Sequence, residues 1–312
     1  MYTDEVEKIR ELMSKGYGYR RIAKALGLSQ YRVRSIIRSL VIDKLNLKAP
    51  KQKRGTKLKL KKVSKKRVTH KVAVVLSDIH IPYHCPSALA IAMDYTESLK
   101  PDRIVLNGDI VDMYSVSRYM KDPLRIDTFQ EELDQARDFL RLLRQQNPKA
   151  KITFIKGNHE ARIEKFLIDR APELSSLRCL SLDSLLGLSE FDIDFIDQGI
   201  KLGNLYVEHG AVARSSPGAS ALAYYRKMGT SVLVGHIHKL NVIRHRNVYG
   251  VHTLVENACL CDQSFDWLHT PVNWQQGFTE VHYQSNGNFQ IFQHCIVDGK
   301  LVSGDMEYKA CR

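Results

Sequence analysis

The chain has no long apolar segment. No run within its 312 residues approaches the roughly 18 consecutive apolar residues that a membrane-spanning helix requires. The N-terminus is charged and periodic, and it lacks the apolar block of a secretory signal peptide. We therefore expect a globular protein of the cytoplasm. Its apolar share of 44% is ample for a core, and its length suggests two domains of about 100 to 200 residues each.

Cysteine is scarce and dispersed. The six cysteines are spread over a chain too large to need disulfide bonds for stability, so we expect free thiols. Cys259 and Cys261 form a close pair, but no second Cys or His pair at zinc-finger spacing accompanies them. We therefore interpret the two as buried strand cysteines rather than as a metal pair.

Acidic residues are absent from residues 48–71, and positive charge is concentrated as a result. This segment carries twelve Lys and Arg, and residues 1–47 carry ten against five Asp and Glu. The rest of the chain carries 25 against 29, so the net charge of +13 lies in the N-terminal quarter, where it suits a polyanion such as nucleic acid. Because like charges repel, we expect residues 48–70 to be an extended basic linker, either a tether that follows phosphates or a solvated spacer.

Residues 1–47 have apolar side chains at helical spacing. The pattern predicts helices over residues 4–14 and 19–26 and a third helix that begins after Ser29. Gly27 can end the second helix with a positive φ, and Ser29 can cap the third. The segment is therefore predicted to be a small all-helical domain.

The third helix turns its apolar residues inward and leaves Arg32, Arg34 and Arg38 outward. The segment resembles the small helix-turn-helix modules of resolvases and transcription regulators. The resemblance implies that residues 29–40 are a recognition helix that enters the major groove of DNA. The alternative is a three-helix module for protein interaction or dimerisation, but the outward arginines and the basic segment favour DNA.

Five short apolar runs each end in side chains that bind metals. The runs are residues 71–77, 102–107, 151–155, 205–208 and 231–234. Their β-branched content predicts buried parallel strands, and such strands place ligands beyond their carboxyl ends. The side chains found there are Asp78, His80, Asp109, Asp112, Asn158, His159, His209, His236 and His238. A single Asp or His after a strand is an ordinary loop residue in about half of all cases. Five such motifs in order are not explained by that alternative.

The ordered motifs D-x-H, G-D, G-N-H-(D/E), H and G-H-x-H resemble those of the calcineurin-like metallophosphoesterase superfamily, over roughly residues 71 to 260. The resemblance implies an α/β fold with a two-sheet α-β-β-α core, here preceded by the small helix-turn-helix domain. We therefore predict a DNA-binding domain at residues 1–47, the basic linker at 48–70 and a catalytic domain at 71–312.

The resemblance also implies two divalent metal ions and a role for each motif residue. One ion would be held by Asp78, His80 and His238, the other by Asn158, His209 and His236, with Asp109 bridging them. His159 would contact the substrate phosphate and protonate the leaving oxygen, with Asp112 orienting it; the alternative for Asp112 is a helix N-cap. Manganese is the superfamily's common activator, although oxygen and imidazole ligands also admit iron, zinc or magnesium.

Two such ions can activate a shared water and neutralise phosphate oxygens during in-line attack by hydroxide. We expect a DNA phosphodiesterase or nuclease of DNA processing or repair, because the N-terminal quarter would deliver the site to a polyanion. One alternative is a serine/threonine-type or small-molecule phosphatase, since residues 108–112 and 157–160 also resemble those enzymes. Such phosphatases carry Arg-Gly where Met113 and Tyr114 stand here. The other is a non-catalytic DNA-binding regulator, which the intact ligand set opposes.

The remaining segments predict the surroundings of this site. Residues 88–99 and 128–146 are predicted crossover helices, and 161–188 a helical insertion that caps the cleft. In that insertion, Arg162 is either a phosphate contact or a surface residue. After His238 the pattern alternates, which predicts strands that form the antiparallel second half of the two-sheet core.

Overall fold

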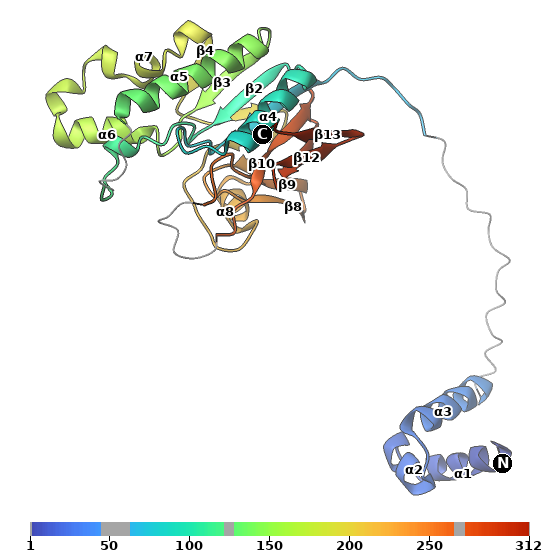
Figure 1. Ribbon diagram of the computed structural model, residues 1–312. Helices are drawn as coiled ribbons and strands as arrows, with labels where there is room; N and C mark the ends of the chain where they lie inside the picture. The colour runs from blue at the N-terminus through green and yellow to red at the C-terminus, as the bar shows by residue number, and fades with distance from the viewer. Residues whose placement is uncertain (1, 45–62, 122–127, 265–271, 312) are drawn as a thin grey trace. The chain divides into compact units, whose positions relative to one another are not determined.

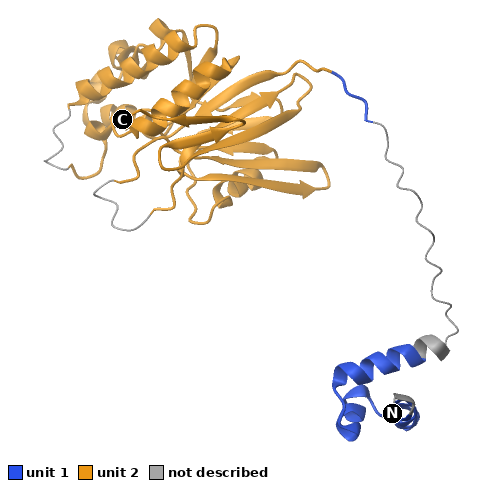
Figure 2. Ribbon diagram, turned by 45° about the vertical axis from the view of Figure 1, so that its right-hand side comes forward, with its two compact units in different colours: residues 1–66 blue, residues 67–312 orange. Residues whose placement is uncertain are grey.

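The computed structural model describes residues 2–44, 63–121, 128–264 and 272–311. The chain divides into two compact units, residues 1–66 and residues 67–312 (Figure 2). The predicted linker, residues 48–70, lies mostly outside the described residues. No helix among the described ranges is long and apolar enough to cross a membrane.

The first unit contains the three predicted helices. They are α1 (Tyr2–Ser14), α2 (Tyr19–Leu26) and α3 (Gln30–Lys44). Ile9, Ile22 and Val33, one from each helix, are fully buried against one another. Gly27 ends α2 with a φ of 66°, and the Ser29 hydroxyl accepts a hydrogen bond from the backbone of the first turn of α3. Both cap predictions are therefore confirmed.

The second unit is built on two sheets. The larger has the order β11-β10-β1-β2-β3-β4. Its strands are β1 (Lys71–Leu76), β2 (Arg103–Asn107), β3 (Lys151–Ile155), β4 (Ile193–Ile196), β10 (Gln276–Tyr283) and β11 (Phe289–Ile296). β1 to β4 are parallel to one another, and β10 is antiparallel to β1.

The smaller sheet has the order β5-β6-β7-β9-β8. Its strands are β5 (Ile200–Leu202), β6 (Leu205–Glu208), β7 (Ser231–Val234), β8 (Leu240–Asn247) and β9 (Gly250–Asn257). A separate hairpin joins β12 (Lys300–Ser303) to β13 (Met306–Lys309). In the smaller sheet β6, β7 and β9 are parallel.

Alternation along β1 explains how the layers pack. Ala73 and Val75 face the smaller sheet and pack with residues such as Val207, whereas Val74 and Leu76 face the helices on the other side. Those helices include α4 (Pro86–Leu99) and α5 (Phe129–Gln146), and α8 (Ala219–Met228) packs on the smaller sheet (Figure 1). The unit is therefore a two-sheet core between helical layers, as the sequence predicted.

Shorter helices follow β2 and β3. They are η1 (Tyr114–Val116), α6 (Ala161–Arg170), η2 (Pro172–Leu174), η3 (Arg178–Leu180), α7 (Leu182–Leu186) and η4 (Ser189–Phe191). The insertion predicted at 161–188 is therefore helical, although it is broken into several short pieces.

The prediction that the strands after His238 form an antiparallel second half is partly wrong. β8 and β9 form a hairpin in the smaller sheet, but β9 pairs with β7 in parallel. β10 and β11 join the larger sheet instead, with Val281 opposite Ala73 of β1. An alternating pattern says which face of a strand is buried, and it does not select the neighbouring strand.

Candidate metal centre

Side chains from five strand ends meet at one edge of the second unit. They are Asp78 and His80 after β1, Asp109 and Asp112 after β2, Asn158 and His159 after β3, His209 after β6, and His236 and His238 after β7. Asp78, Asp109 and His209 are each at most 3% exposed. Ionisable groups buried to this degree must be paired with one another or with a metal.

Asp78, His80 and His238 form the first cluster, with one ligand atom of each within 4.8 Å of the others. Asp78 Oδ1 lies 3.3 Å from His238 Nε2, and the Nε2 atoms of His80 and His238 lie 3.2 Å apart. Two imidazole nitrogens this close cannot both carry a proton without repulsion. A divalent cation among these three side chains would accept both lone pairs, so the donor set fits a metal.

Asp109, His209 and His236 form the second cluster, and Asn158 Oδ1 lies 3.2 Å from His209 Nε2. His209 Nδ1 donates to the carbonyl oxygen of Asn107 at 2.8 Å, which directs the Nε2 lone pair towards the cluster. His236 Nδ1 is buried and has no hydrogen-bond partner among the described residues. These donors also fit a metal.

Asp109 stands between the clusters. Its Oδ2 lies 3.1 Å from His209 Nε2, and its Oδ1 accepts the backbone N–H of His159 at 2.8 Å. Burial opposes ionisation, but the charges of His209, His159 and His80 outweigh it and hold the pKa of Asp109 well below its usual range. A carboxylate that stays charged beside both clusters suits the predicted bridge.

The buried carboxylates act on their histidine neighbours in turn. Burial alone would lower the pKa of His209, yet Asp109 raises it to about 10. The pKa of His238 rises to about 9 against the same effect of burial, because Asp78 lies beside it. A histidine must be neutral to bind a metal, so metal binding here displaces protons.

Five of the predicted ligands have a left-handed backbone, which the sequence does not reveal. They are Asp78, His80, Asp109, His236 and His238, with φ between 51° and 70°. This conformation costs a non-glycine residue roughly 1–2 kcal/mol. Backbone hydrogen bonds between the loops stabilise it, including Asp78 N–H to the Gly108 carbonyl and His80 N–H to the Asp109 carbonyl, both at 3.0 Å. Such strain is typical of functional sites.

Glu160 is a residue whose role the sequence analysis missed. Its side chain is fully buried and accepts backbone N–H groups of Asp109, Ile110, Val111 and Gly157 at 2.8–3.1 Å. The carboxylate thus fixes the loop after β2 against the loop after β3. The motif G-N-H-(D/E) contains this residue, but only the fold shows that the acid binds backbone rather than metal or substrate.

His159 and Asp112 lie together at the rim of the first cluster. His159 Nδ1 donates to the Asp112 carbonyl oxygen at 2.8 Å, and the Asp112 carboxylate lies 3.1 Å from His80 Nδ1 and 3.3 Å from His159 Nδ1. The interpretation of Asp112 as a helix N-cap is wrong, because Met113 occupies that position before η1 and no side chain caps the helix. Asp112 instead contacts two site histidines.

Arg162 also reaches the site. Its Nη2 lies 2.9 Å from His159 Nε2, and its Nη1 donates to the Asp112 carbonyl at 2.8 Å. Arg162 stands one turn after His159 at the start of α6, so its interpretation as a surface residue is wrong. Sequence spacing alone did not tell which way this side chain points.

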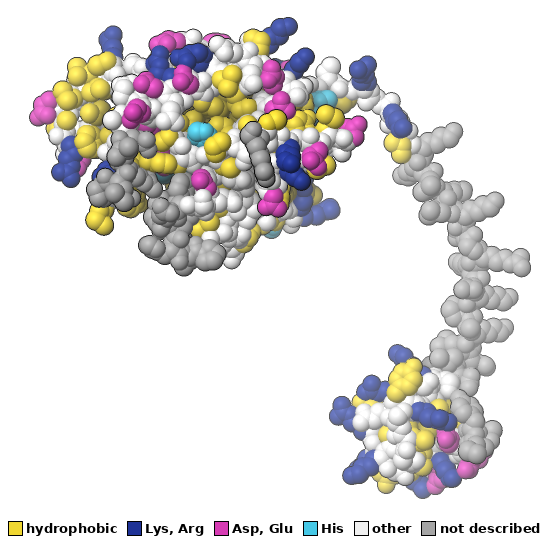
Figure 3. All heavy atoms as spheres, viewed as in Figure 1, with side chains coloured by type: hydrophobic (Ala, Val, Ile, Leu, Met, Phe, Trp, Pro, Cys, Tyr) yellow, Lys and Arg dark blue, Asp and Glu magenta, His cyan; other side chains and the backbone are white. Residues whose placement is uncertain are grey.

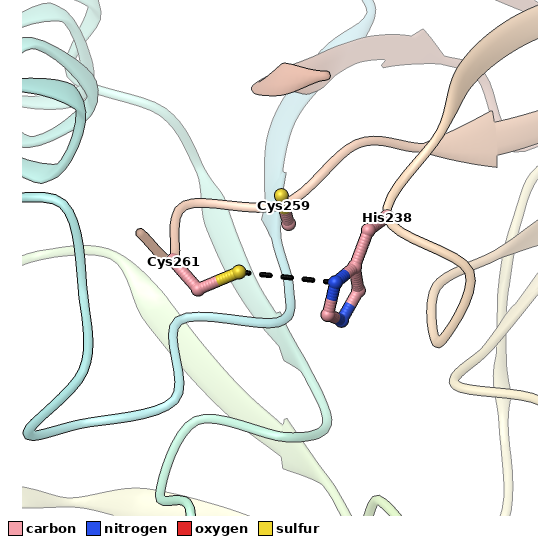
Figure 4. A group of neighbouring side chains, drawn as sticks. All are labelled: His238, Cys259 and Cys261. Atoms are coloured by element: carbon pink, nitrogen blue, oxygen red, sulfur yellow. Dashed lines mark hydrogen bonds between the residues drawn. The ribbon is translucent and has the colours of Figure 1, made fainter. Parts of the chain in front are cut away.

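Cys259 and Cys261 adjoin the centre beside His238 (Figure 4). All six cysteines have free thiols, as predicted, and both members of this pair are buried. They lie in the segment between β9 and β10 rather than in a regular strand. Cys261 Sγ lies 3.8 Å from His238 Nδ1, and the three ligand atoms gather within 4.8 Å. Since His238 Nε2 faces Asp78, the thiols contact the outer edge of the ring.

The predicted DNA contacts belong to the other unit, where all three arginines are exposed. Arg32 forms an ion pair with Glu5 at 2.9 Å, and the Arg34 guanidinium lies 4.0 Å from the centre of the Tyr19 ring. Figure 3 shows Lys and Arg side chains scattered over the visible surface of this unit, among hydrophobic and acidic ones. Their role in DNA binding stays a prediction.

The chain resembles known proteins over the region that carries this centre. Residues 72–271 match the family described as calcineurin-like phosphoesterase. The chain belongs to the calcineurin-like phosphoesterase family. The predicted superfamily is thereby confirmed, and the protein is a metal-dependent phosphoesterase in which side-chain clusters indicate a dinuclear site.

Three individual proteins are similar to the chain. The chain is 29% identical over 222 residues to the gene 54 protein of Mycobacterium phage L5, covering 66% of this chain and 86% of that protein. It is 25% identical over 231 residues to the gene 54 protein of Mycobacterium phage D29, with the same shares. Vacuolar Protein Sorting 29 from Cryptosporidium parvum is similar in structure, with a TM-score of 0.41, 15% identity, and coverage of 77% of this phosphoesterase and 99% of that chain.

Proposed function

We propose that this phosphoesterase is a DNA phosphodiesterase or nuclease of DNA processing or repair. One observation carries the proposal: a metal-binding phosphoesterase centre shares its chain with a basic N-terminal quarter. Residues 1–71 hold 22 of the 47 Lys and Arg and only five of the 34 acidic residues. Positive charge of this density attracts a polyanion, and DNA is a polyanion made of phosphodiesters.

The residues of the centre are proposed to hold two divalent ions. Asp78, His80 and His238 would hold one divalent ion, and Asn158, His209 and His236 the other, with Asp109 shared. When bound, two such ions supply a nucleophile at neutral pH and neutralise the phosphate oxygens. We propose manganese as the physiological metal, with iron, zinc or magnesium as substitutes that the same ligands admit.

His159 is proposed as the general acid. Burial lowers its pKa, but Asp109 and Asp112 outweigh that effect and raise the pKa above its ordinary value, which favours the protonated ring. Its Nδ1–H is fixed by Asp112, which leaves the Nε2 proton for the leaving oxygen. Protonation matters most when the leaving group is a poor one, such as a deoxyribose oxygen.

Arg162 and His159 are proposed to bind one phosphate oxygen of the substrate together. The two face each other at 2.9 Å, and they cannot both present a proton to the other. A phosphate oxygen placed to one side of this pair would accept a hydrogen bond from the guanidinium and another from the imidazolium. Arg162 also favours the phosphatase alternative. Phosphatases carry a phosphate-binding arginine at the position of Met113, which is fully buried here, and Arg162 could supply that arginine from α6 instead.

The test is a comparison of substrates with the purified protein and manganese. Single-stranded DNA, duplex DNA, RNA, a phosphodiester dye and a phosphomonoester dye are compared by kcat/KM. The proposal expects DNA to be cleaved most efficiently and the phosphodiester dye better than the phosphomonoester dye. Efficient hydrolysis of the phosphomonoester with no DNA cleavage would establish the phosphatase alternative. Metal-dependent DNA binding without hydrolysis of any substrate would favour the regulator.

A further inference from the structure

A charged groove adjoins the metal centre between α6 and the segment that follows η1. It has a cavity volume of about 950 Å³, in the range of sites that enclose a ligand much larger than a single phosphate. Asn158, a predicted metal ligand, lines this groove together with Arg162. The groove is therefore continuous with the centre in which the phosphate would be cleaved.

Cations dominate the groove. Arg118, Arg162, Lys165 and Arg170 line it, and the one acidic residue of the lining, Asp169, forms an ion pair with Arg170 at 2.8 Å. No ion pair of Arg118 or Lys165 occurs among the described residues. Four cations against one carboxylate suit a ligand with several negative charges.

Two aromatic side chains interleave with these cations. Tyr119 is 64% exposed and Phe166 is 39% exposed, and both line the groove. Exposed rings next to such cations serve as platforms on which nucleic-acid bases stack, while the cations contact the phosphates. A duplex offers no free base faces along its length, whereas a single strand does. The combination therefore favours a single strand.

The length of α6 sets the size of the ligand. Arg162, Phe166 and Arg170 fall on one face because they are spaced by four residues, and Lys165 lies beside them, three residues after Arg162. From Arg162 to Arg170 the helix rises about 12 Å, which matches three or four nucleotides at the duplex spacing of about 3.4 Å per strand and fewer nucleotides of an extended single strand. The ligand would thus run from the scissile phosphate along α6.

We propose that this groove binds single-stranded DNA, holding a few nucleotides on one side of the scissile phosphate. The proposal rests on the proposed nuclease function. It adds that the second unit itself selects an unpaired strand, with Phe166 and Tyr119 stacking on bases and Lys165 contacting phosphate. Duplex DNA would then be cleaved only where its strands separate.

The test compares Phe166→Ala, Tyr119→Ala and Lys165→Ala in the full chain with manganese. The substrates are the hexanucleotide (dT)6, a blunt 12-base-pair duplex and bis(4-nitrophenyl) phosphate. Tyr249→Ala is the matched control, because Tyr249 is 89% exposed on the turn between β8 and β9 and does not line the groove. Melting temperatures check that each variant is folded.

Each aromatic truncation is expected to lower kcat/KM on (dT)6 by about 5- to 100-fold, the equivalent of one base stack. The loss on the small diester should be several times smaller, and Tyr249→Ala should change neither. Extension of the oligonucleotide from two to six residues should raise kcat/KM in the wild type and not in Phe166→Ala.

The outcomes separate this proposal from the one on which it rests. If (dT)6 is cleaved equally well by the wild type and all three variants, or if the blunt duplex is the better substrate, the groove proposal fails and the nuclease proposal stands. If no DNA is cleaved, the nuclease proposal fails. The groove proposal then stands only if fluorescent (dT)6 still binds and Phe166→Ala weakens that binding relative to Tyr249→Ala.

Discussion

The two units of this phosphoesterase carry their charges in opposite ways. In the N-terminal unit the cations are at the surface, where the Arg32 side chain is 53% exposed and forms an ion pair with Glu5. In the second unit Asp78 and Asp109 are at most 1% exposed, and each contacts several polar groups. Exposed charges act over distance and are screened by salt, whereas buried charges act through short contacts that salt hardly reaches.

This difference teaches where single substitutions should matter. An exposed arginine is one of many, so its loss should produce a small and graded effect. A buried carboxylate in the centre is irreplaceable, because its partners would be left charged and unpaired. The predictions below test that contrast.

Asp109→Asn tests it most severely. We expect hydrolysis to be lost and elemental analysis to find less metal. The loss should exceed the roughly 10- to 100-fold that follows when a residue that only hydrogen-bonds to a metal ligand is removed. The reason is that Asp109 is the ligand that the motif match assigns to both ions. Substantial turnover with two bound metals would remove Asp109 from its bridging role. Arg38→Gln in the exposed unit is the contrasting control, and it should leave hydrolysis of a phosphodiester dye unchanged.

His159→Gln should separate proton transfer from metal binding. Both metals should remain, but the rate on substrates with poor leaving groups should fall on the order of 10²- to 10⁴-fold. The loss on nitrophenyl esters should be smaller, because their leaving group needs no proton. If elemental analysis finds a metal missing, His159 is a ligand and not an acid.

Deletion of residues 1–66 removes the exposed cations of the N-terminal unit and leaves every predicted metal ligand in place. DNA binding should weaken and become less dependent on salt. On duplex DNA, the slope of log K against log salt should flatten by about 0.9 for each phosphate that the shortened protein no longer neutralises. Hydrolysis of a small phosphodiester should survive.

The three outward arginines sharpen that test. Joint replacement of Arg32, Arg34 and Arg38 should reduce preference among DNA sequences if they contact bases, and weaken binding uniformly if they contact phosphates. Unchanged DNA cleavage by the deletion variant would make a protein or nucleotide the better substrate.

Burial sets the direction of the pKa shift at Glu132. Burial raises its pKa to about 8 from an ordinary 4.5, against the Met113 N–H that its carboxylate accepts. Between these values the folded state keeps a proton that the unfolded state releases, so stability falls as pH rises, by up to about 1.4 kcal/mol per pH unit. Glu132→Gln should therefore narrow the difference in Tm between pH 5 and pH 8. An unchanged difference would show that Glu132 is ionised in the folded protein.

The smallest effect is expected at the outer edge of His238. Cys261→Ala removes the thiol that lies 3.8 Å from His238 Nδ1. It should weaken metal binding by less than about tenfold, the lower limit for loss of a residue that contacts a metal ligand. Calorimetric titration with manganese measures this, and Cys295→Ala, at an exposed cysteine, is the control. A loss as large as that of Asp109→Asn would make the thiol itself a ligand.

Much of the fold was readable from local patterns. The helices of the N-terminal unit, β1, β2, β3, β6 and β7 all lie where apolar periodicity placed them, because each buries a face that its own sequence defines. The family was likewise readable, since its motifs follow strand ends in order. The pairing of β10 with β1 was not, because partner choice depends on residues about 200 positions apart.

The sequence by itself determined which residues gather at the centre and what metals they suit, because side-chain chemistry and strand order are local properties. Only the tertiary structure decided how those residues are held. The left-handed backbone at Asp78 and Asp109, the grip of Glu160 on the loop after β2, and the turn of Arg162 towards His159 all depend on contacts between loops from different strands. Such contacts form only when the sheets bring the loops together, so no stretch of sequence encodes them alone.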